Sequence, residues 1–289
     1  MKQTNLFLTY GIMVLLFFIN GCKSEPLTTI NSSDGVSISF DNVGKGEPAI
    51  ILVHGWANTR SIWDAQVSYF SQKYQVIAVD LPGFGKSGNN RNEWSMGSYG
   101  EDISAIIQQL DLDKVVLVGF SMGAPVVIEA AAREPEKVIG VVLVDDLQEV
   151  EMQISPPMAH FIDSMMMDLI DYPSMEKLVN NGFFKKNVES SYNRVIAMLD
   201  GAPHIGWRES LAGNITWQNE QCTKSIQAVK APIIAINSDM QPTNVEAFRK
   251  YAPTFKVKIV EGVGHVIMWD NTEKFNQLLE ESIQDFVND

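Results

Sequence analysis

The chain has 289 residues, of which 45% are hydrophobic, and its formal net charge is −13. This composition provides the core of one large domain with room for an inserted subdomain, so it excludes a disordered or fibrous chain. An acidic surface repels phosphate backbones, and we therefore expect no nucleic-acid partner.

The first residues have the pattern of an export signal. Lys2 gives a positively charged N-terminal region, and the apolar run from Leu6 to Ile19 that follows is shorter than a typical transmembrane helix. The run ends in Asn20-Gly21-Cys22, which resembles the lipobox of bacterial lipoproteins. The resemblance implies a signal peptide over 1–21, lipid on Cys22, anchoring to the bacterial cell envelope, and a tether over 22–35. An uncleaved anchor helix and a plain signal peptide are the alternatives.

The residues up to 146 alternate between predicted strands and helices. Apolar or alternating runs predict strands, and apolar residues at helical spacing predict the helices between them. Expected strands are 36–40, 49–53, 75–79, 115–118 and 138–144, and expected helices are 61–74, 99–110 and 125–133. This order predicts a mostly parallel, doubly wound α/β sheet.

The alternation stops after Asp146 and resumes at Pro232. Residues 147–223 lack strand patterns and predict a helical lid, inserted into a core made of 36–146 and 224–289. The second part of the core is expected to contain strands 232–237 and 255–260 and helices 243–251 and 272–287. A helical insertion between strands of one sheet is expected above the carboxyl ends of the strands, where ligands bind.

Ser121 is the predicted nucleophile. It lies in Gly119-Phe120-Ser121-Met122-Gly123, between a buried strand and a helix. The Gly-x-Ser-x-Gly pattern in this setting predicts a tight turn that exposes the seryl oxygen above the sheet. An ordinary structural turn is the alternative.

A seryl hydroxyl needs a base, and His265 is the predicted one. It follows Gly262-Val263-Gly264 beyond the last predicted strand. Asp239, between Ser121 and His265 in chain order, is expected to orient the imidazole. Asp145 and Asp146 at the end of the preceding strand are the alternatives, although they could instead cap a helix of the lid.

The oxyanion of an acyl-transfer reaction needs two N–H donors. The backbone amides of Met122 and Trp56 are the expected donors, because Met122 follows the nucleophile and Trp56 follows His54-Gly55. His54 is expected to hold this loop in place rather than to act as a base.

Four motifs together resemble the α/β-hydrolase fold family from about residue 36 to the end: His54-Gly55-Trp56, the segment 80–87, the turn at Ser121, and Gly264-His265. The resemblance implies an eight-stranded sheet, a Ser–Asp–His triad and a lid. The family's usual acid loop is Gly-x-x-Asp before Pro, whereas residues 237–242 contain no glycine, so the chain departs from the family pattern around Asp239. Serine at the turn argues against epoxide hydrolases and haloalkane dehalogenases, which carry Asp there.

The lid is rich in methionine and aromatic residues, some of which are expected to line an apolar pocket while most pack the lid onto the core. They are Met152, Met158, Met165, Met166, Met167, Met175, Met198, Phe161, Phe183, Phe184, Trp207 and Trp217. We expect His160 and His204 on the lid surface, Cys222 in the core or at a hinge, and neither a metal nor a cofactor, because no ligand spacing is present.

The expected function is hydrolysis of a carboxylic ester or related acyl bond in a partly apolar small molecule. Thioester, lactone, amide and C–C substrates stay open. The alternative is a ligand-binding or sensory homologue with little turnover.

Overall fold

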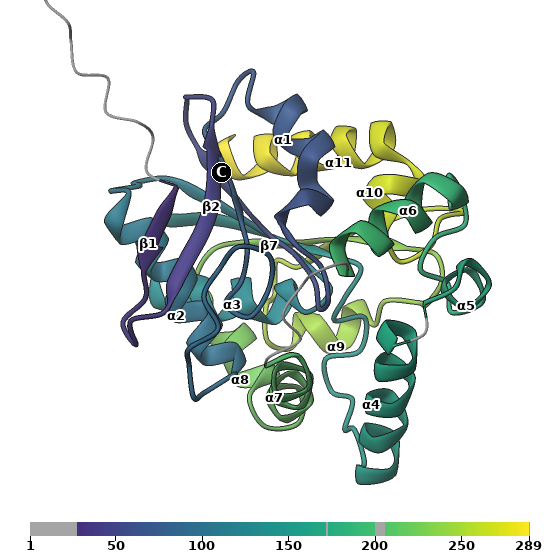
Figure 1. The fold of residues 1–289 in the computed structure, drawn as a ribbon. Helices are drawn as coiled ribbons and strands as arrows, with labels where there is room; N and C mark the ends of the chain where they lie inside the picture. Colours follow the sequence, from purple (N-terminus) through teal and green to yellow (C-terminus); the bar gives the residue numbers. More distant parts are fainter. Residues whose placement is uncertain (1–27, 172, 200–205, 289) are drawn as a thin grey trace, which may run out of the picture.

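The computed structural model describes residues 28–171, 173–199 and 206–288 (Figure 1). The predicted signal peptide and Cys22 lie outside these ranges, and so does His204. No helix within these ranges combines the length and the apolar character that crossing a membrane requires.

An eight-stranded sheet forms the centre of the molecule, with the order β1-β2-β4-β3-β5-β6-β7-β8. The pairs from β4 to β8 are parallel, whereas β1 and β2 are antiparallel to their neighbours. The predicted mostly parallel, doubly wound sheet is therefore confirmed. The strands are β1 (Thr29–Asn31), β2 (Ser37–Val43), β3 (Ala49–Val53), β4 (Val76–Val79), β5 (Val115–Phe120), β6 (Val138–Val144), β7 (Ile233–Ser238) and β8 (Lys256–Val260).

Helices cover both faces of the sheet (Figure 1). One face carries α1 (Asp64–Phe70) and α11 (Thr272–Asn288), and the other carries α2 (Met96–Gln109), α3 (Gly123–Arg133) and α8 (Cys222–Ala228). Because helices lie on both sides, every residue of β3 and β5 is buried. This burial explains why the two strands are continuous apolar runs in the sequence.

Three local elements differ from the sequence prediction. The helix expected over 61–74 is a 3-10 turn, η1 (Arg60–Trp63), followed by α1, which ends at Phe70. Helix α2 begins at Met96 because the Ser95 side chain accepts a hydrogen bond from the Ser98 amide and caps it. Strand β1 was missed in the segment interpreted as a tether, because three residues are too few for a period-2 signal.

The segment between β6 and β7 is helical. In Figure 1 its first helices lie beyond one end of the sheet, whereas the last one packs beside α3 on a face of the sheet. They are α4 (Pro156–Asp171), α5 (Met175–Asn180), α6 (Val188–Leu199) and α7 (Trp207–Glu220), followed by α8. Helix α7 is held on the core by Trp207, whose Nε1–H donates to the Gly83 carbonyl at 2.8 Å. We use the term lid for residues 147–223.

Candidate active site

Ser121 occupies a strained turn between β5 and α3. Its φ of +50° lies in the left-handed region, which residues other than glycine rarely adopt. Backbone hydrogen bonds hold the turn: the Ser121 amide donates to the Val144 carbonyl at 3.0 Å, and the Ala124 amide donates to the Ser121 carbonyl at 2.7 Å. Strain held in this way is a feature of functional sites.

The glycines on either side of Ser121 are required by contact. A Cβ on Gly123 would lie 2.6 Å from the Val53 carbonyl oxygen, and a Cβ on Gly119 would lie 2.5 Å from the Gly123 carbonyl carbon. A Cβ on Gly55 would lie 3.0 Å from the Ser121 Cβ. The predicted tight turn is confirmed, and the His54-Gly55-Trp56 loop passes directly beside it.

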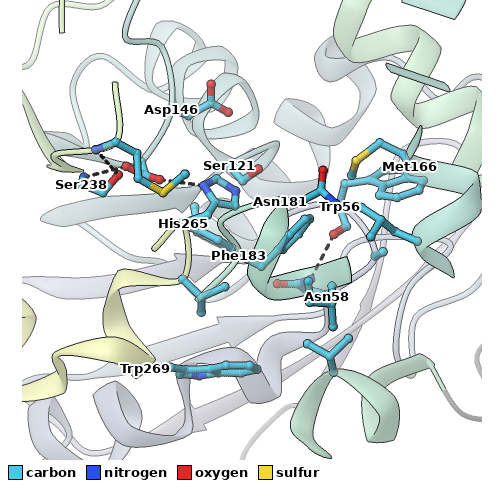
Figure 2. Close-up of a pocket in the computed structure, with 18 of the residues that line it drawn as sticks. Trp56, Asn58, Ser121, Asp146, Met166, Asn181, Phe183, Ser238, His265 and Trp269 are labelled. Carbon is cyan, nitrogen blue, oxygen red and sulfur yellow. Dashed lines mark hydrogen bonds and ion pairs between the residues drawn. The ribbon is translucent and has the colours of Figure 1, made fainter. Parts of the chain in front are cut away.

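His265 lies next to Ser121 in the wall of the same cavity (Figure 2). Its ring packs against Phe120 and Phe183, at centroid separations of 4.7 and 6.0 Å. The His265 Nδ1 lies 2.8 Å from the Asp145 Oδ2. A proton on Nδ1 that is donated to this carboxylate leaves Nε2 as the acceptor that a serine base needs.

Asp145 is held rigidly at the end of β6. Its φ is +50°, its side chain is buried, and its Oδ1 accepts a hydrogen bond of 2.7 Å from the Ser238 amide. Both carboxylate oxygens are therefore engaged, one by the neighbouring strand β7 and one by the imidazole. Such a carboxylate fixes the ring orientation and stabilises the imidazolium.

The prediction that Asp239 orients His265 is wrong. The Asp239 side chain is 42% exposed and lies 4.0 Å from the Lys185 ammonium. Its Oδ1 accepts a hydrogen bond from the Gly262 amide at 3.1 Å. Strand β7 runs two residues beyond Ile236, the partner of the last β6 residue, so Asp239 lies farther along than Asp145. Asp145 leaves β6 with a left-handed backbone, and its carboxylate meets the His265 ring. Asp145, one of the two alternatives from the sequence, is the residue whose carboxylate is hydrogen-bonded to the His265 ring.

His54 holds the loop that carries Trp56, as the sequence predicted. Its ring is fully buried, its Nδ1 donates to the Gly55 carbonyl at 2.7 Å, and its Nε2 accepts from the Leu81 amide at 3.0 Å. Burial lowers the pKa of His54, which keeps the ring neutral. The Trp56 Nε1–H donates to the Trp207 carbonyl at 2.7 Å and joins this loop to α7.

Comparison with known proteins identifies the family. The family described as alpha/beta hydrolase fold matches residues 48–272. The chain belongs to the α/β-hydrolase fold family.

Similar proteins cover most of this α/β-hydrolase chain. An uncharacterized protein of Mycobacterium tuberculosis is 24% identical over 89% of this chain and 81% of its own length. A pimeloyl-[acyl-carrier protein] methyl ester esterase of Legionella pneumophila is 25% identical over 86% of this chain and 100% of its own. The solved structure of a thermophilic esterase from Thermogutta terrifontis superposes with a TM-score of 0.75 at 21% identity, covering 90% of this chain and 97% of that one.

The α/β-hydrolase core and the lid line a cavity of about 370 Å³ that is partly open to solvent. Ser121, His265, Asp145 and Asp146 lie in its wall, together with Trp56 from the loop described above. Lid helices supply an apolar part, and polar side chains that the sequence analysis did not single out line the remainder. The apolar group comprises Met165, Met166, Leu169, Ile170, Leu178, Val195 and Leu199, and the polar group comprises Asn58, Gln148, Asn181, Ser238 and Gln241.

Asp146 carries a perturbed carboxyl group in this wall. Burial raises its pKa to about 6, although the Leu147 amide donates to its Oδ1 at 2.6 Å and His265 lies nearby. Asp145 and Asp146 are adjacent in sequence but differ in role, because only the Asp145 carboxylate is hydrogen-bonded to the His265 ring.

The part of the chain that the structure describes contains no group of three or more His, Cys, Asp or Glu residues arranged to hold a metal ion. Cys222 is buried, as expected for a core residue, and burial raises the pKa of its thiol to about 12. A thiol with a raised pKa is a poor nucleophile.

Proposed function

We propose that this α/β-hydrolase is a serine hydrolase that cleaves a carboxylic ester or a related acyl bond of a partly apolar small molecule. The observation that carries the proposal is the arrangement of Ser121, His265 and Asp145 at one cavity wall, with Ser121 on a strained turn. The esterases among the similar proteins support the same class of reaction.

The proposed reaction has two halves. The His265 Nε2 accepts the Ser121 proton while the seryl oxygen attacks the carbonyl carbon, and the backbone amides of Trp56 and Met122 stabilise the oxyanion. The tetrahedral intermediate expels the alcohol, which takes the proton from His265. A water molecule then gives a proton to His265 and attacks the acyl-enzyme. The second tetrahedral intermediate releases the acid, and His265 returns the proton to the Ser121 oxygen. Asp145 stabilises the imidazolium in both halves.

The cavity lining indicates the substrate class. An apolar wall from the lid favours an apolar acyl or alcohol part, and a volume of about 370 Å³ fits a small molecule. No Lys or Arg lies among the described residues of the lining, whereas Asp145 and Asp146 add negative charge. We therefore propose neutral substrates with short or medium acyl chains, and we expect p-nitrophenyl butyrate and octanoate to be cleaved faster than palmitate.

A fluorophosphonate probe tests the proposal, because it reacts covalently with an activated serine. The wild type should be labelled, and Ser121→Ala should not. Ser238→Ala is the matched control, since Ser238 lines the same cavity and the substitution keeps its backbone amide on Asp145. Equal labelling of wild type and Ser121→Ala would end the proposal. Binding of small esters without release of product, unchanged by His265→Ala, would instead support the ligand-binding alternative.

We also propose, from the sequence of residues 19–22, that the protein is exported and anchored in a membrane through lipid on Cys22. Metabolic labelling with a fatty acid should be lost in Cys22→Ala and kept in Cys222→Ala, since the Cys222 thiol is buried.

A further inference from the structure

Lid residues 182–187 lie against the loop that carries His265. The His265 amide donates to the Gly182 carbonyl and the Val266 amide donates to the Phe183 carbonyl, both at 2.8 Å. Gly264 leaves no space between the two segments: a Cβ there would lie 2.6 Å from the Phe184 Cα. The candidate base is therefore hydrogen-bonded to the lid through its own backbone.

Asp270 joins the same two segments from the other side. Its Oδ2 accepts hydrogen bonds from the amides of Gly264 and Lys185, both at 2.7 Å, and its Oδ1 accepts one from the Lys186 amide at 2.9 Å. The side chain is 4% exposed. A buried carboxylate is costly unless its oxygens are hydrogen-bonded, and charged acceptors form the stronger hydrogen bonds.

Further contacts extend this junction along α10 (Ile267–Asp270). The Asn187 Nδ2 donates to the Trp269 carbonyl at 2.8 Å, and the Arg194 guanidinium lies 5.1 Å from the centre of the Trp269 ring. Phe183 contacts the His265 ring and lines the cavity, so one lid segment meets both the substrate space and the base.

We propose that Asp270 is a positioning residue for His265 and that it fixes the base to the lid. The proposal rests on the proposed function. The Asp270 carboxylate holds Gly264, the residue directly before His265, and simultaneously holds the lid at Lys185 and Lys186. Displacement of residues 182–187 would move the imidazole relative to Ser121. The junction thus fixes the position of His265 relative to the apolar cavity wall that the lid supplies.

The test compares Asp270→Ala and Asp270→Asn with the wild type. Alanine removes every acceptor, and we expect kcat to fall about 10- to 100-fold with little change in KM, because a base misplaced by about 1 Å transfers protons poorly. Asparagine keeps one oxygen and should give an intermediate loss. The downfield proton resonance of the His265 Nδ1–H should weaken in the same order, and the amides of Gly264, Lys185 and Lys186 should exchange hydrogen faster.

Asp102→Asn is the matched control. Asp102, in helix α2, is also buried, but its carboxylate is paired with the Arg91 guanidinium at 2.8 Å. Its substitution should lower stability while leaving kcat and the His265 resonance unchanged. If Asp270→Ala does not fold, Asn187→Gly provides a milder variant. Glycine tolerates the φ of +52° at residue 187, and the substitution removes the hydrogen bond to the Trp269 carbonyl. This variant should lower kcat by a smaller factor.

Unchanged kcat and an unchanged His265 resonance in a folded Asp270 variant would overturn the inference and leave Asp270 a purely structural residue. Failure of the proposed function has a different signature. The wild type would then not react with the fluorophosphonate probe, whereas the resonance and the exchange rates would still respond to Asp270→Ala.

Discussion

Replacing Asp145 with asparagine should disable the proposed reaction without removing the side chain. The Asp145 Oδ1 accepts from the Ser238 amide at 2.7 Å, so the single oxygen of asparagine is expected to stay there. Its NH2 group would then face the His265 Nδ1, where the carboxylate now lies at 2.8 Å. Two donors cannot pair, and the imidazole must move its proton to Nε2. That tautomer cannot accept the Ser121 proton.

The expected loss follows from this tautomer change. We expect kcat to fall about 10³- to 10⁴-fold, which corresponds to about 4 to 5.5 kcal/mol of transition-state stabilisation. KM should change little, because Asp145 contacts His265 rather than the apolar wall that holds the substrate. The assay is steady-state hydrolysis of p-nitrophenyl butyrate, with denaturant unfolding of each variant to show that the protein is folded.

Asp239→Asn is the control. Asp239 is partly exposed and its contacts are with Gly262 and Lys185, so kcat should stay within about twofold of the wild type. A folded Asp145→Asn protein with normal kcat would refute the reasoning, and so would a large loss of kcat in Asp239→Asn.

Two further predictions concern stability. Because the folded protein raises the pKa of Asp146 from 3.8 to about 6, ionisation opposes folding, and the free energy of unfolding falls as pH rises through this window. Asp146→Asn should therefore be more stable than the wild type at pH 8, by about 1 to 2 kcal/mol after allowance for solvent at the cavity wall. Below about pH 4 the two proteins should be equally stable, because the Asp146 carboxyl is then protonated in both states. Urea unfolding at several pH values measures this difference, and a difference that stays constant across pH would contradict the prediction. Gly123→Ala should lower the free energy of unfolding by about 3 kcal/mol, since its Cβ would meet rigid backbone 2.6 Å away. Gly97→Ala in helix α2 is the matched control, because the nearest atom, on the flexible Arg133 side chain, would lie 3.5 Å from its Cβ. It should be neutral or stabilising in the same urea unfolding experiment.

The sequence alone determined those features that depend on neighbouring residues. Continuous apolar runs predicted β3, β5 and β6, because strands buried on both faces need apolar side chains in both directions. The turn at Ser121 was predictable because its glycines and its strand and helix flanks are contiguous in the chain. The role of His54 in holding the loop beside Ser121 was predictable from its place in the sequence, whereas the burial that lowers its pKa is seen only in the structure.

Only the tertiary structure decided which carboxylate meets His265. Asp145 and Asp239 both follow strands, both precede His265 in the chain, and β6 and β7 are neighbours in the sheet. The choice depends on where each strand ends and on the left-handed conformation of Asp145, and neither quantity is encoded by a local pattern. The junction at Asp270 was hidden for the same reason, because its partners at Lys185 and Lys186 lie far away in the chain. Local spacing specifies which chemistry is present, whereas the packing of distant segments specifies which groups touch.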